Sequence, residues 1–204
     1  IDITKIDAGS FDLHLENYDI IKVVENITLS VVPFVESKNI NIIFDTEVEE
    51  RVIACDPDKI ERIMLNLISN AVKFTPQGGY IYVSIYNRTD RIAISVKDTG
   101  IGIPPAMQKK IFERFVQVEH SIRRNQEGSG IGLSLVKSIV EMHKGSVDLK
   151  SSQGQGSEFV ISLPAITLPE STSENLGINN TLDNDDIKNK KIEKITIEFS
   201  DIYT

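Results

Sequence analysis

A two-faced helix followed directly by a hairpin is the feature that most restricts the folds open to this chain. Apolar residues recur at helical spacing across residues 58–74, and the segment ends at a Pro-Gln-Gly-Gly turn. Two segments of alternating pattern follow at 80–87 and 91–97, joined by Arg-Thr-Asp, which is typical of paired antiparallel strands. Helices set against antiparallel strands predict an α+β fold built as a two-layer sandwich.

The other periodic segments fit the same layout. A helix over 18–38 is expected, with a kink at Pro33 because proline removes a helical hydrogen bond. The remaining expected elements are strands at 41–46 and 51–54, a helical piece at 107–115, a helix at 130–143 and a closing hairpin of 146–149 with 158–163.

Composition divides the chain into four expected parts. Residues 1–15 read as the end of a helix and a connector, with an extended piece at 11–15, and 16–164 as one globular domain. Ser, Asn, Asp and Thr dominate after Pro164, so 165–190 is expected to be a flexible polar linker. Alternating isoleucines and a phenylalanine predict a strand in the tail, 191–204.

Composition and charge exclude several classes of protein. The 204 residues are 40% hydrophobic and 25% charged, as in a soluble domain, and no apolar run is long enough to span a bilayer. A net charge of −8 argues against sequence-independent binding to nucleic acid phosphates. The single cysteine, Cys55, excludes an internal disulfide and is expected to be inert core. Because Ile1 opens the chain without Met, we expect an excised fragment.

The helix over 58–74 carries a polar stripe opposite its apolar face. The stripe consists of Lys59, Arg62, Asn66, Asn70 and Lys73. A solvated face is the simplest reading, yet asparagine is a poor residue inside a helix, so two of them one turn apart ask for a reason. An amide oxygen is a ligand that Mg²⁺ accepts, and a lysine one turn on could meet phosphate charge.

One carboxylate stands among glycines at the end of a predicted strand. Asp98 is followed by Thr-Gly-Ile-Gly-Ile-Pro-Pro. Glycines allow the backbone to approach a flat ligand, and a buried carboxylate can accept a hydrogen bond from the exocyclic amine of adenine. Viewed alone, Asp98 could equally cap a turn before the next helix.

A glycine turn opens the helix expected at 130–143. The run is Gly-Ser-Gly-Ile-Gly-Leu at 128–133, and free N–H groups at such a helix start make an anion site. A dinucleotide-binding fingerprint fails because Leu133 stands where the third glycine belongs and no parallel βαβ unit precedes it. The polar stretch 117–127, with Arg123 and Arg124, suits a mobile lid or a plain solvated loop.

Together these runs resemble the catalytic ATP-binding domain of bacterial sensor histidine kinases, in the superfamily of gyrase-type ATPases and heat-shock chaperones. LNLISNAVKFTP is similar to its asparagine box, DTGIGIPP to its first glycine box, IFERF to its phenylalanine box and GSGIGLSLV to its second glycine box. The resemblance covers about residues 1–164. It implies the Bergerat ATP-binding fold, a mixed, mainly antiparallel sheet with helices on one face, over 16–164, and the end of a dimerisation helix before it.

The resemblance also implies ATP and Mg²⁺ as cofactors and assigns roles to residues. Asn70 would be the Mg²⁺ ligand, supported by Asn66, while Asp98 would accept from adenine. Catalytic roles are implied for Asn66, Asn70, Lys73, Arg123 and Arg124. The nucleotide site would be lined by Asn66, Asn70, Lys73, Phe74, Asp98, Gly100, Gly102, Ile103, Gly128, Ser129, Gly130, Ile131, Gly132 and Leu133. Phe112 and Phe115 would anchor the lid or simply pack in the core.

One departure from the superfamily bears on the reaction. Its hydrolases carry a glutamate one turn before the metal asparagine, where this chain has Asn66, an amide without useful basicity. Water should therefore be a poor acceptor, and the phosphoryl acceptor must come from elsewhere. His14, His120 and His143 do not stand in the sequence context of a phosphorylated histidine; His143 reads as helix-terminal and the other two as solvated.

The expected function is therefore that of a histidine kinase catalytic domain, which passes the γ-phosphoryl group to a histidine outside this chain. Its implied partners are its own dimerisation domain, in a homodimer, and a response regulator, with no nucleic acid and no direct membrane contact. A cytoplasmic domain of a membrane-anchored parent is expected. The alternatives are a nucleotide-sensing interaction module without transfer and a hydrolysing ATPase of the same superfamily.

Overall fold

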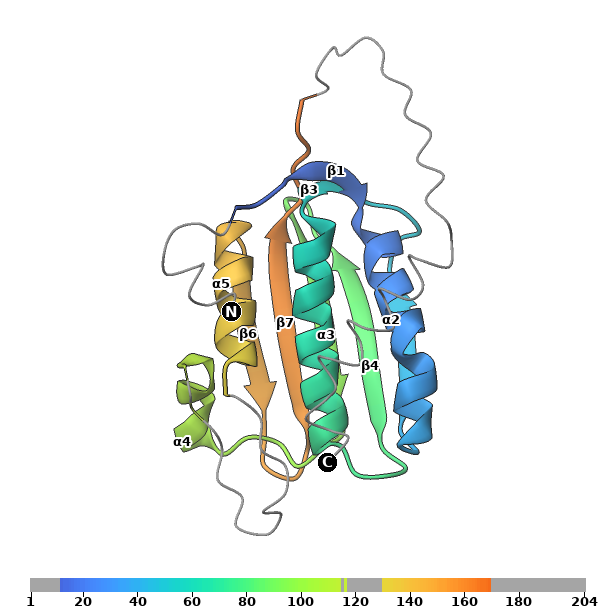
Figure 1. Cartoon of the computed structure of the whole chain (residues 1–204), viewed down its shortest axis with the longest axis vertical. Coiled ribbons are helices and arrows are strands. Elements are labelled where there is room, and N and C mark those ends of the chain that lie inside the picture. Colours follow the sequence, from blue (N-terminus) through green and yellow to red (C-terminus); the bar gives the residue numbers. More distant parts are fainter. Residues whose placement is uncertain (1–11, 115, 117–129, 170–204) are drawn as a thin grey trace.

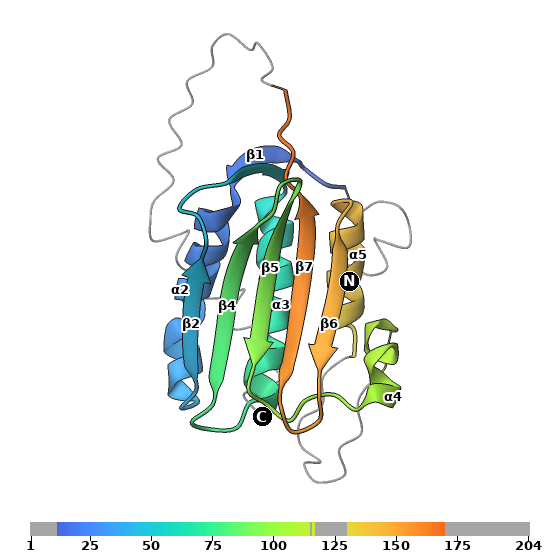
Figure 2. The same ribbon diagram turned by 180° about the vertical axis from the view of Figure 1, so that it is seen from behind.

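A mixed sheet of five strands, covered on one face by α2, α3 and α5, forms the fold (Figures 1 and 2). The computed structural model describes residues 12–114, 116 and 130–169. The elements are β1 (Glu16–Asp19), α2 (Ile20–Ser37), β2 (Asn41–Thr46), β3 (Val52–Cys55), α3 (Pro57–Phe74), β4 (Tyr80–Asn87), β5 (Arg91–Asp98), α4 (Pro105–Gln108), the 3-10 turn η1 (Lys110–Phe112), α5 (Gly132–Met142), β6 (Ser146–Ser151) and β7 (Ser157–Pro164).

The strand order of the large sheet is β2-β4-β5-β7-β6. Only β2 runs parallel to its neighbour β4, while the pairs β4–β5, β5–β7 and β6–β7 are antiparallel. A separate two-stranded ribbon, β1 with β3, lies across the upper end of the molecule in Figure 1. The predicted two-layer α+β architecture, with a mixed and mainly antiparallel sheet, is confirmed.

Helix α3 supplies the centre of the core. Its predicted apolar stripe is buried throughout, because every member is at most 5% exposed. Along β4, buried side chains alternate with less buried ones, as expected for a strand whose sheet is covered by helices on one face. The stripe consists of Ile60, Ile63, Met64, Leu67, Ile68 and Ala71. None of the helices in the described part of the chain is both long and apolar enough to cross a bilayer.

The predicted start of the first helix was wrong by two residues. Tyr18 belongs to β1, not to α2, because the side chain of Asp19 caps the helix by accepting from the N–H of Ile21 at 3.2 Å. An extended piece was expected at 11–15, and the structure has strand β1 at Glu16–Asp19 instead. The pairing of β1 with β3 determines the position of this strand. Helix α2 continues through Pro33.

Other boundaries agree with the expectation to within a few residues, and some expectations cannot be followed. The helical piece expected at 107–115 is split into α4 and η1, and α4 starts at the proline pair 104–105. The dimerisation-helix end at 1–9, most of the linker and the tail strand lie outside the described residues. The first residues of the expected linker contact the domain, since the carbonyl of Ile166 accepts from the N–H of Ala54 at 2.7 Å.

At the upper end of the molecule, polar contacts gather around the buried Asp56, the N-cap of α3. Its carboxylate accepts from the N–H groups of Lys59 and His14 at 3.2 and 3.0 Å. Its own N–H donates to Nε2 of His143 at 3.2 Å. As predicted, His143 is helix-terminal. Cys55, which precedes Asp56 in the chain, is fully buried, and burial raises the pKa of its thiol to about 12.

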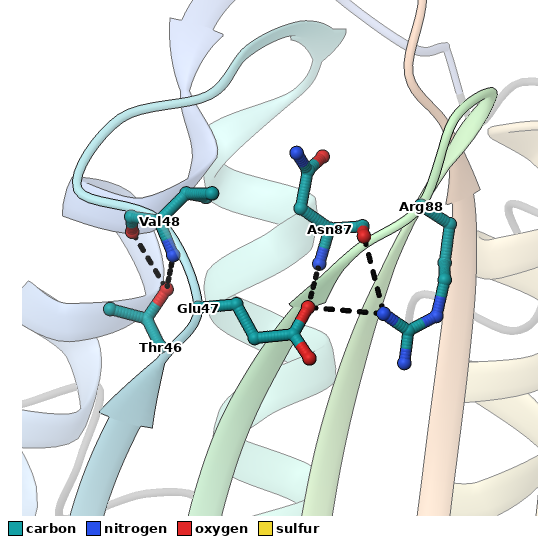
Figure 3. A network of polar contacts seen from close by, with 5 residues as sticks. All are labelled: Thr46, Glu47, Val48, Asn87 and Arg88. Atoms are coloured by element: carbon teal, nitrogen blue, oxygen red, sulfur yellow. Dashed lines mark hydrogen bonds and ion pairs between the residues drawn. The ribbon is translucent and has the colours of Figure 1, made fainter.

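The same end of the large sheet is closed by a surface network that follows β2 (Figure 3). Oε2 of Glu47 accepts from the backbone N–H of Asn87 and from Nη1 of Arg88, each at 3.0 Å. The hydroxyl of Thr46 bonds to the backbone of Val48 in the same turn. Asp98 lies at the other end of β5, so this network is structural and remote from the predicted site.

Candidate ATP-binding site

Asn66 lies where α3 and α5 meet. Its side chain is on the predicted polar stripe, yet it is only 8% exposed. Nδ2 donates to the carbonyl of Arg62 at 2.9 Å, and Oδ1 occupies the place that a Cβ on Gly132 would need. Because the amide is anchored to its own helix, the first residue of α5 can approach only as glycine. The asparagine box and the second glycine box are therefore in direct contact.

Asn70 and Lys73 follow Asn66 along the same face of α3, one and two turns closer to its C-terminus. Both are half-buried, so neither belongs to a freely solvated face. Nζ of Lys73 lies 5.7 Å from the ring centroid of Phe74, a cation–π distance, and Phe74 is 37% exposed. The stripe thus runs from buried amide to partly exposed cation toward the lower end of the molecule in Figure 1.

Asp98 ends β5 with its carboxylate buried, at 5% exposure. Oδ1 accepts from the backbone N–H of Gly100 at 2.8 Å and of Ser157 at 3.3 Å. Oδ2 accepts no hydrogen bond from a described residue. Burial raises the pKa of this carboxyl above its ordinary value of 3.8, although the two N–H donors act to lower it. One carboxylate oxygen is therefore committed to the fold and the other is available to a ligand.

The loop after Asp98 is pressed between the end of α3 and the β6–β7 turn. A Cβ on Gly100 would collide with the carbonyl oxygen of Phe74, which also accepts from the N–H of Ile101 at 3.2 Å. Gly102 has φ +67° and no room beside the carbonyl of Ser152. The two glycines therefore let backbone pack against backbone around Asp98. Their predicted approach to a flat ligand stays a prediction.

The start of helix α5 has no side-chain cap among the residues that the structure describes. The helix begins at Gly132, and its N-cap, Ile131, provides no side-chain hydrogen bond. Gly130 has φ +66°, which turns the chain into the helix, and Leu133 in the first turn is half-buried. The first N–H groups of an uncapped helix can bind an anion. Because α5 begins at Gly132, the predicted helix start at 130 was two residues early. The anion site stays a prediction.

Several predicted site residues cannot be placed. Arg123, Arg124, Gly128, Ser129 and Phe115 lie outside the described residues, as does His120.

The other phenylalanine of the phenylalanine box has a packing role. The ring of Phe112 makes an edge contact with that of Phe159 on β7, at 6.2 Å between centroids and 82° between planes. Of the two interpretations open for Phe112, core packing has direct support.

Sequence reasoning missed Ser157, whose N–H holds Asp98. The reason is that this contact depends on the antiparallel β5–β7 pairing. Lys97 lies opposite Glu158, so Asp98, which follows Lys97, meets Ser157, which precedes Glu158. The available signal was the pair of glycines in the turn before β7. Gly154 and Gly156 have φ +80° and +83°, and a Cβ on Gly156 would strike the carbonyl of Asp98.

These features fit a nucleotide with a bound cation. Asp98 is a buried residue and no described residue donates to its Oδ2, which suits an exocyclic amine. The start of α5, which has no side-chain cap from Ile131, suits phosphate. The amide of Asn70, half-buried on the same helix as Asn66, is a neutral oxygen donor of the kind that Mg²⁺ accepts alongside water and phosphate. The C-terminal end of α3, the end of β5 and the start of α5 lie toward the lower end of the fold in Figure 1.

Comparison with known proteins gives the family. Residues 55–167 match the family model described as histidine kinase-, DNA gyrase B-, and HSP90-like ATPase. The chain is 34% identical over 182 residues to the circadian input-output histidine kinase CikA of Synechococcus elongatus, covering 88% of this chain and 24% of CikA. It is 40% identical over 137 residues to the adaptive-response sensory kinase SasA of a Synechococcus species, covering 67% of this chain and 36% of SasA. The chain thus spans well under two thirds of these relatives.

Solved structures show the same fold. Full-length ShkA in complex with AMPPNP superimposes with a TM-score of 0.68 at 30% identity, over 78% of this chain and 32% of that one. The catalytic domain of histidine kinase ThkA matches with a TM-score of 0.66 at 23% identity, over 75% of this chain and 97% of that one. The chain therefore belongs to the family of histidine kinase-, DNA gyrase B- and HSP90-like ATPases, and within it to the ATP-binding domains of sensor histidine kinases.

Proposed function

We propose that this chain is the catalytic domain of a sensor histidine kinase that binds Mg-ATP and presents its γ-phosphoryl group to a histidine on a separate dimerisation domain. The observation that carries the proposal is the Asp98 carboxylate, buried and held through Oδ1 while Oδ2 accepts nothing from the described residues. The family and the kinase names of its relatives support the same reading.

In this proposal Asp98 selects the base. Oδ2 accepts a hydrogen bond from the exocyclic amine of adenine, while Gly100 and Gly102 bring the backbone against the ring and Ile103 and Phe74 line it. The support is the absence of room for side chains at both glycines and the partly exposed ring of Phe74. A buried hydrogen bond to a charged acceptor gives strong discrimination, because a base without the donor leaves the carboxylate unpaired.

The polar face of α3 and the start of α5 hold the triphosphate end. Asn70 is the proposed Mg²⁺ ligand, Asn66 keeps the two helices in register, and Lys73 meets phosphate charge. The N–H groups at Gly132 and Leu133 donate to phosphate oxygens, and Gly128, Ser129, Gly130 and Ile131 are proposed to extend this cradle. Arg123 and Arg124 are proposed to close over the phosphates. When bound, Mg²⁺ neutralises phosphate charge, and the protein supplies positioning.

The acceptor lies outside the chain. Both ring nitrogens of the buried His143 are used, since Nε2 accepts from Asp56 and Nδ1 therefore carries the proton that it donates to the carbonyl of Ile139 at 2.9 Å. His14 is exposed, and its backbone N–H donates to Asp56 at the N-terminus of α3. The amide of Asn66, fixed between Arg62 and Gly132, cannot act as a base toward water, so slow hydrolysis is expected.

The proposed partners follow from the family. A structure of ThkA in complex with the response regulator protein TrrA, which matches this chain at a TM-score of 0.66 and 22% identity, supports a response regulator as one partner. The second is the dimerisation domain of the same protein, in a homodimer. We place the domain in the cytoplasm and its parent at the bacterial membrane, without nucleic acid or direct membrane contact by this domain.

Calorimetric titration of the chain with ATP tests the proposal, with and without Mg²⁺. The proposed function predicts saturable binding that Mg²⁺ strengthens and that Asp98→Asn removes. Asn70→Asp should leave the base contact intact and alter only the dependence on Mg²⁺. Unchanged ATP affinity in the Asp98 variant would refute the adenine role.

A further inference from the structure

A set of polar contacts outside the four motifs ties the Asp98 loop to the β6–β7 hairpin. It consists of the side chains of Gln108, Ser151 and Ser157, and it is named here the loop brace. These residues come from α4, the end of β6 and the start of β7. Their side chains bond to the loop through Ile103 and reach Asp98 through the backbone of Ser157.

The hydroxyl of Ser151 is the centre of the brace. Oγ accepts from the N–H of Ile103 at 2.8 Å and lies 3.0 Å from both the carbonyl of Gly156 and Oγ of Ser157. A serine hydroxyl has one proton and two lone pairs. Because the carbonyl can only accept, the Ser151 proton goes to Gly156, and Ser157 then donates to Ser151. Every hydrogen-bonding position of this hydroxyl is therefore used.

Gln108 binds the same loop through the carbonyl of Ile103. Nε2 donates to the carbonyl of Ile103 at 2.9 Å and to the carbonyl of Ser151 at 3.0 Å. Ile103 is thus held at both its N–H and its C=O, by two different side chains. A loop residue with both backbone groups bound to partners outside its own segment cannot shift without breaking those bonds.

The brace ends on the carboxylate that is proposed to select the base. Ser157 gives its hydroxyl proton to Ser151 and its N–H to Oδ1 of Asp98, at 3.3 Å. Gly156, which accepts from Ser151, packs so closely on the carbonyl of Asp98 that a Cβ would not fit. The position of the Ser151 hydroxyl is thereby linked to the direction of the Asp98 carboxylate.

We propose that Gln108, Ser151 and Ser157 are positioning residues that aim the free oxygen of Asp98 at the base, and so set the preference for adenine over a purine with a carbonyl at the same position. This inference rests on the proposed function. Inosine triphosphate is the matched probe, because its base presents an acceptor oxygen where adenine presents a donor amine. A carboxylate oxygen aimed at the 6-position gains no hydrogen bond from that carbonyl.

The test compares the dissociation constants of ATP and inosine triphosphate for the chain and its Ser151→Ala variant. We expect the variant to lose about tenfold in ATP affinity, the equivalent of one well-placed hydrogen bond, while inosine triphosphate affinity changes by less than about twofold. Ser151→Thr keeps the hydroxyl and should restore the preference. Ser152→Ala is the matched control, because that exposed serine makes no side-chain hydrogen bond to a described residue.

Equal weakening of both nucleotides, or no weakening of either, would overturn the brace. Gln108→Met tests the Gln108 side of the brace, and it replaces the serine variant as the test if that variant does not fold. Gln108→Met should reduce the preference for ATP over inosine triphosphate, whereas Gln153→Met, in the exposed turn, is the control and should not. A parent chain that binds ATP no better than inosine triphosphate would instead contradict the proposed role of Asp98, so the two failures are distinguishable.

Discussion

Oδ1 of Asn66 occupies the space in which a side chain on Gly132 would begin. This one relationship joins the helix of the asparagine box to the helix of the second glycine box. The amide cannot simply turn away, since its Nδ2 donates to the carbonyl of Arg62 and the side chain is buried. The distance between the proposed metal face and the proposed phosphate site is therefore determined by an amide and a missing methyl group.

Gly132→Ala should destabilise the domain and weaken nucleotide binding together. The added Cβ forces either α5 away from α3 or the loss of the Asn66–Arg62 hydrogen bond, which would cost about 1–3 kcal/mol for a buried amide. Helix propensity alone would favour alanine. Urea denaturation and ATP titration measure the two effects.

A double-mutant cycle with Asn66→Ala is the control for this prediction. Without the amide, the alanine at position 132 has space, so its cost should shrink or change sign. Additive costs of the two substitutions would contradict the steric account.

Asp98→Asn should abolish ATP binding without unfolding the protein. Because burial raises the carboxyl pKa in the folded state, the stability that Asp98 contributes is present below pH 3.8 and is lost as the pH rises through the folded pKa. The neutral amide avoids this cost at pH 7 and can still accept from Gly100 and Ser157. A melting temperature at or above that of the parent is expected, with ATP affinity lower by about a hundredfold or more.

Asp148→Asn on the exposed face of β6 is the matched control, because it makes the same chemical change away from the site. It should leave ATP affinity unchanged. A large loss of stability in the Asp98 variant would show that the carboxylate serves the fold.

Acid should destabilise the domain through His143. Burial lowers the pKa of this histidine, so the folded state holds it neutral while the unfolded chain takes up a proton near pH 6.5. Its contribution is therefore present above pH 6.5 and is lost as the pH falls through the folded pKa. Thermal melts from about one unit above pH 6.5 to about one and a half units below it should show the decrease. His143→Gln should flatten this part of the profile, whereas His14→Gln, at an exposed site, should leave the slope in place.

Asn17 on β1 holds the segment that follows β7. Its Oδ1 accepts from the N–H of Leu168 at 2.7 Å, and its Nδ2 donates to the carbonyl of the same residue at 3.0 Å. Asn17→Ala should therefore speed hydrogen exchange at the Leu168 amide by about threefold to tenfold, as expected for one exposed contact. Asn41→Ala, which also removes an exposed asparagine, is the control. Unchanged exchange at Leu168 would mean that this contact contributes nothing.

Much of the fold was readable because it depends on local periodicity. The apolar stripe of α3 and the alternation along β4 and β5 predicted the two layers, and the strand ending at Asp98 was located to within one residue. Contacts between distant segments were not readable. The β1–β3 ribbon and the parallel β2–β4 pair depend on closures across the chain that leave no periodic mark.

The same distinction between local sequence signals and contacts of distant segments holds for the site residues. Asn66, Asn70 and Asp98 stood out because each is an unusual residue for its element: asparagine inside a helix, and a carboxylate at the end of an apolar strand. The burial of Asn66 against Gly132 needed the α3–α5 packing. Ser157 and Gln108 are ordinary polar residues in a turn and a short helix, and only the strand register and the loop contacts give them a role.

Transfer of label from γ-labelled ATP tests the central claim most directly. The chain is mixed with Mg²⁺ and a separately produced dimerisation-helix domain that contains the acceptor histidine of the same kinase. The account predicts label on that histidine, none on this chain alone and little free phosphate without the acceptor, with Asp98→Asn abolishing transfer. Rapid release of phosphate in the absence of the acceptor would contradict the role given to Asn66, and ATP binding with no transfer to the histidine would contradict the kinase.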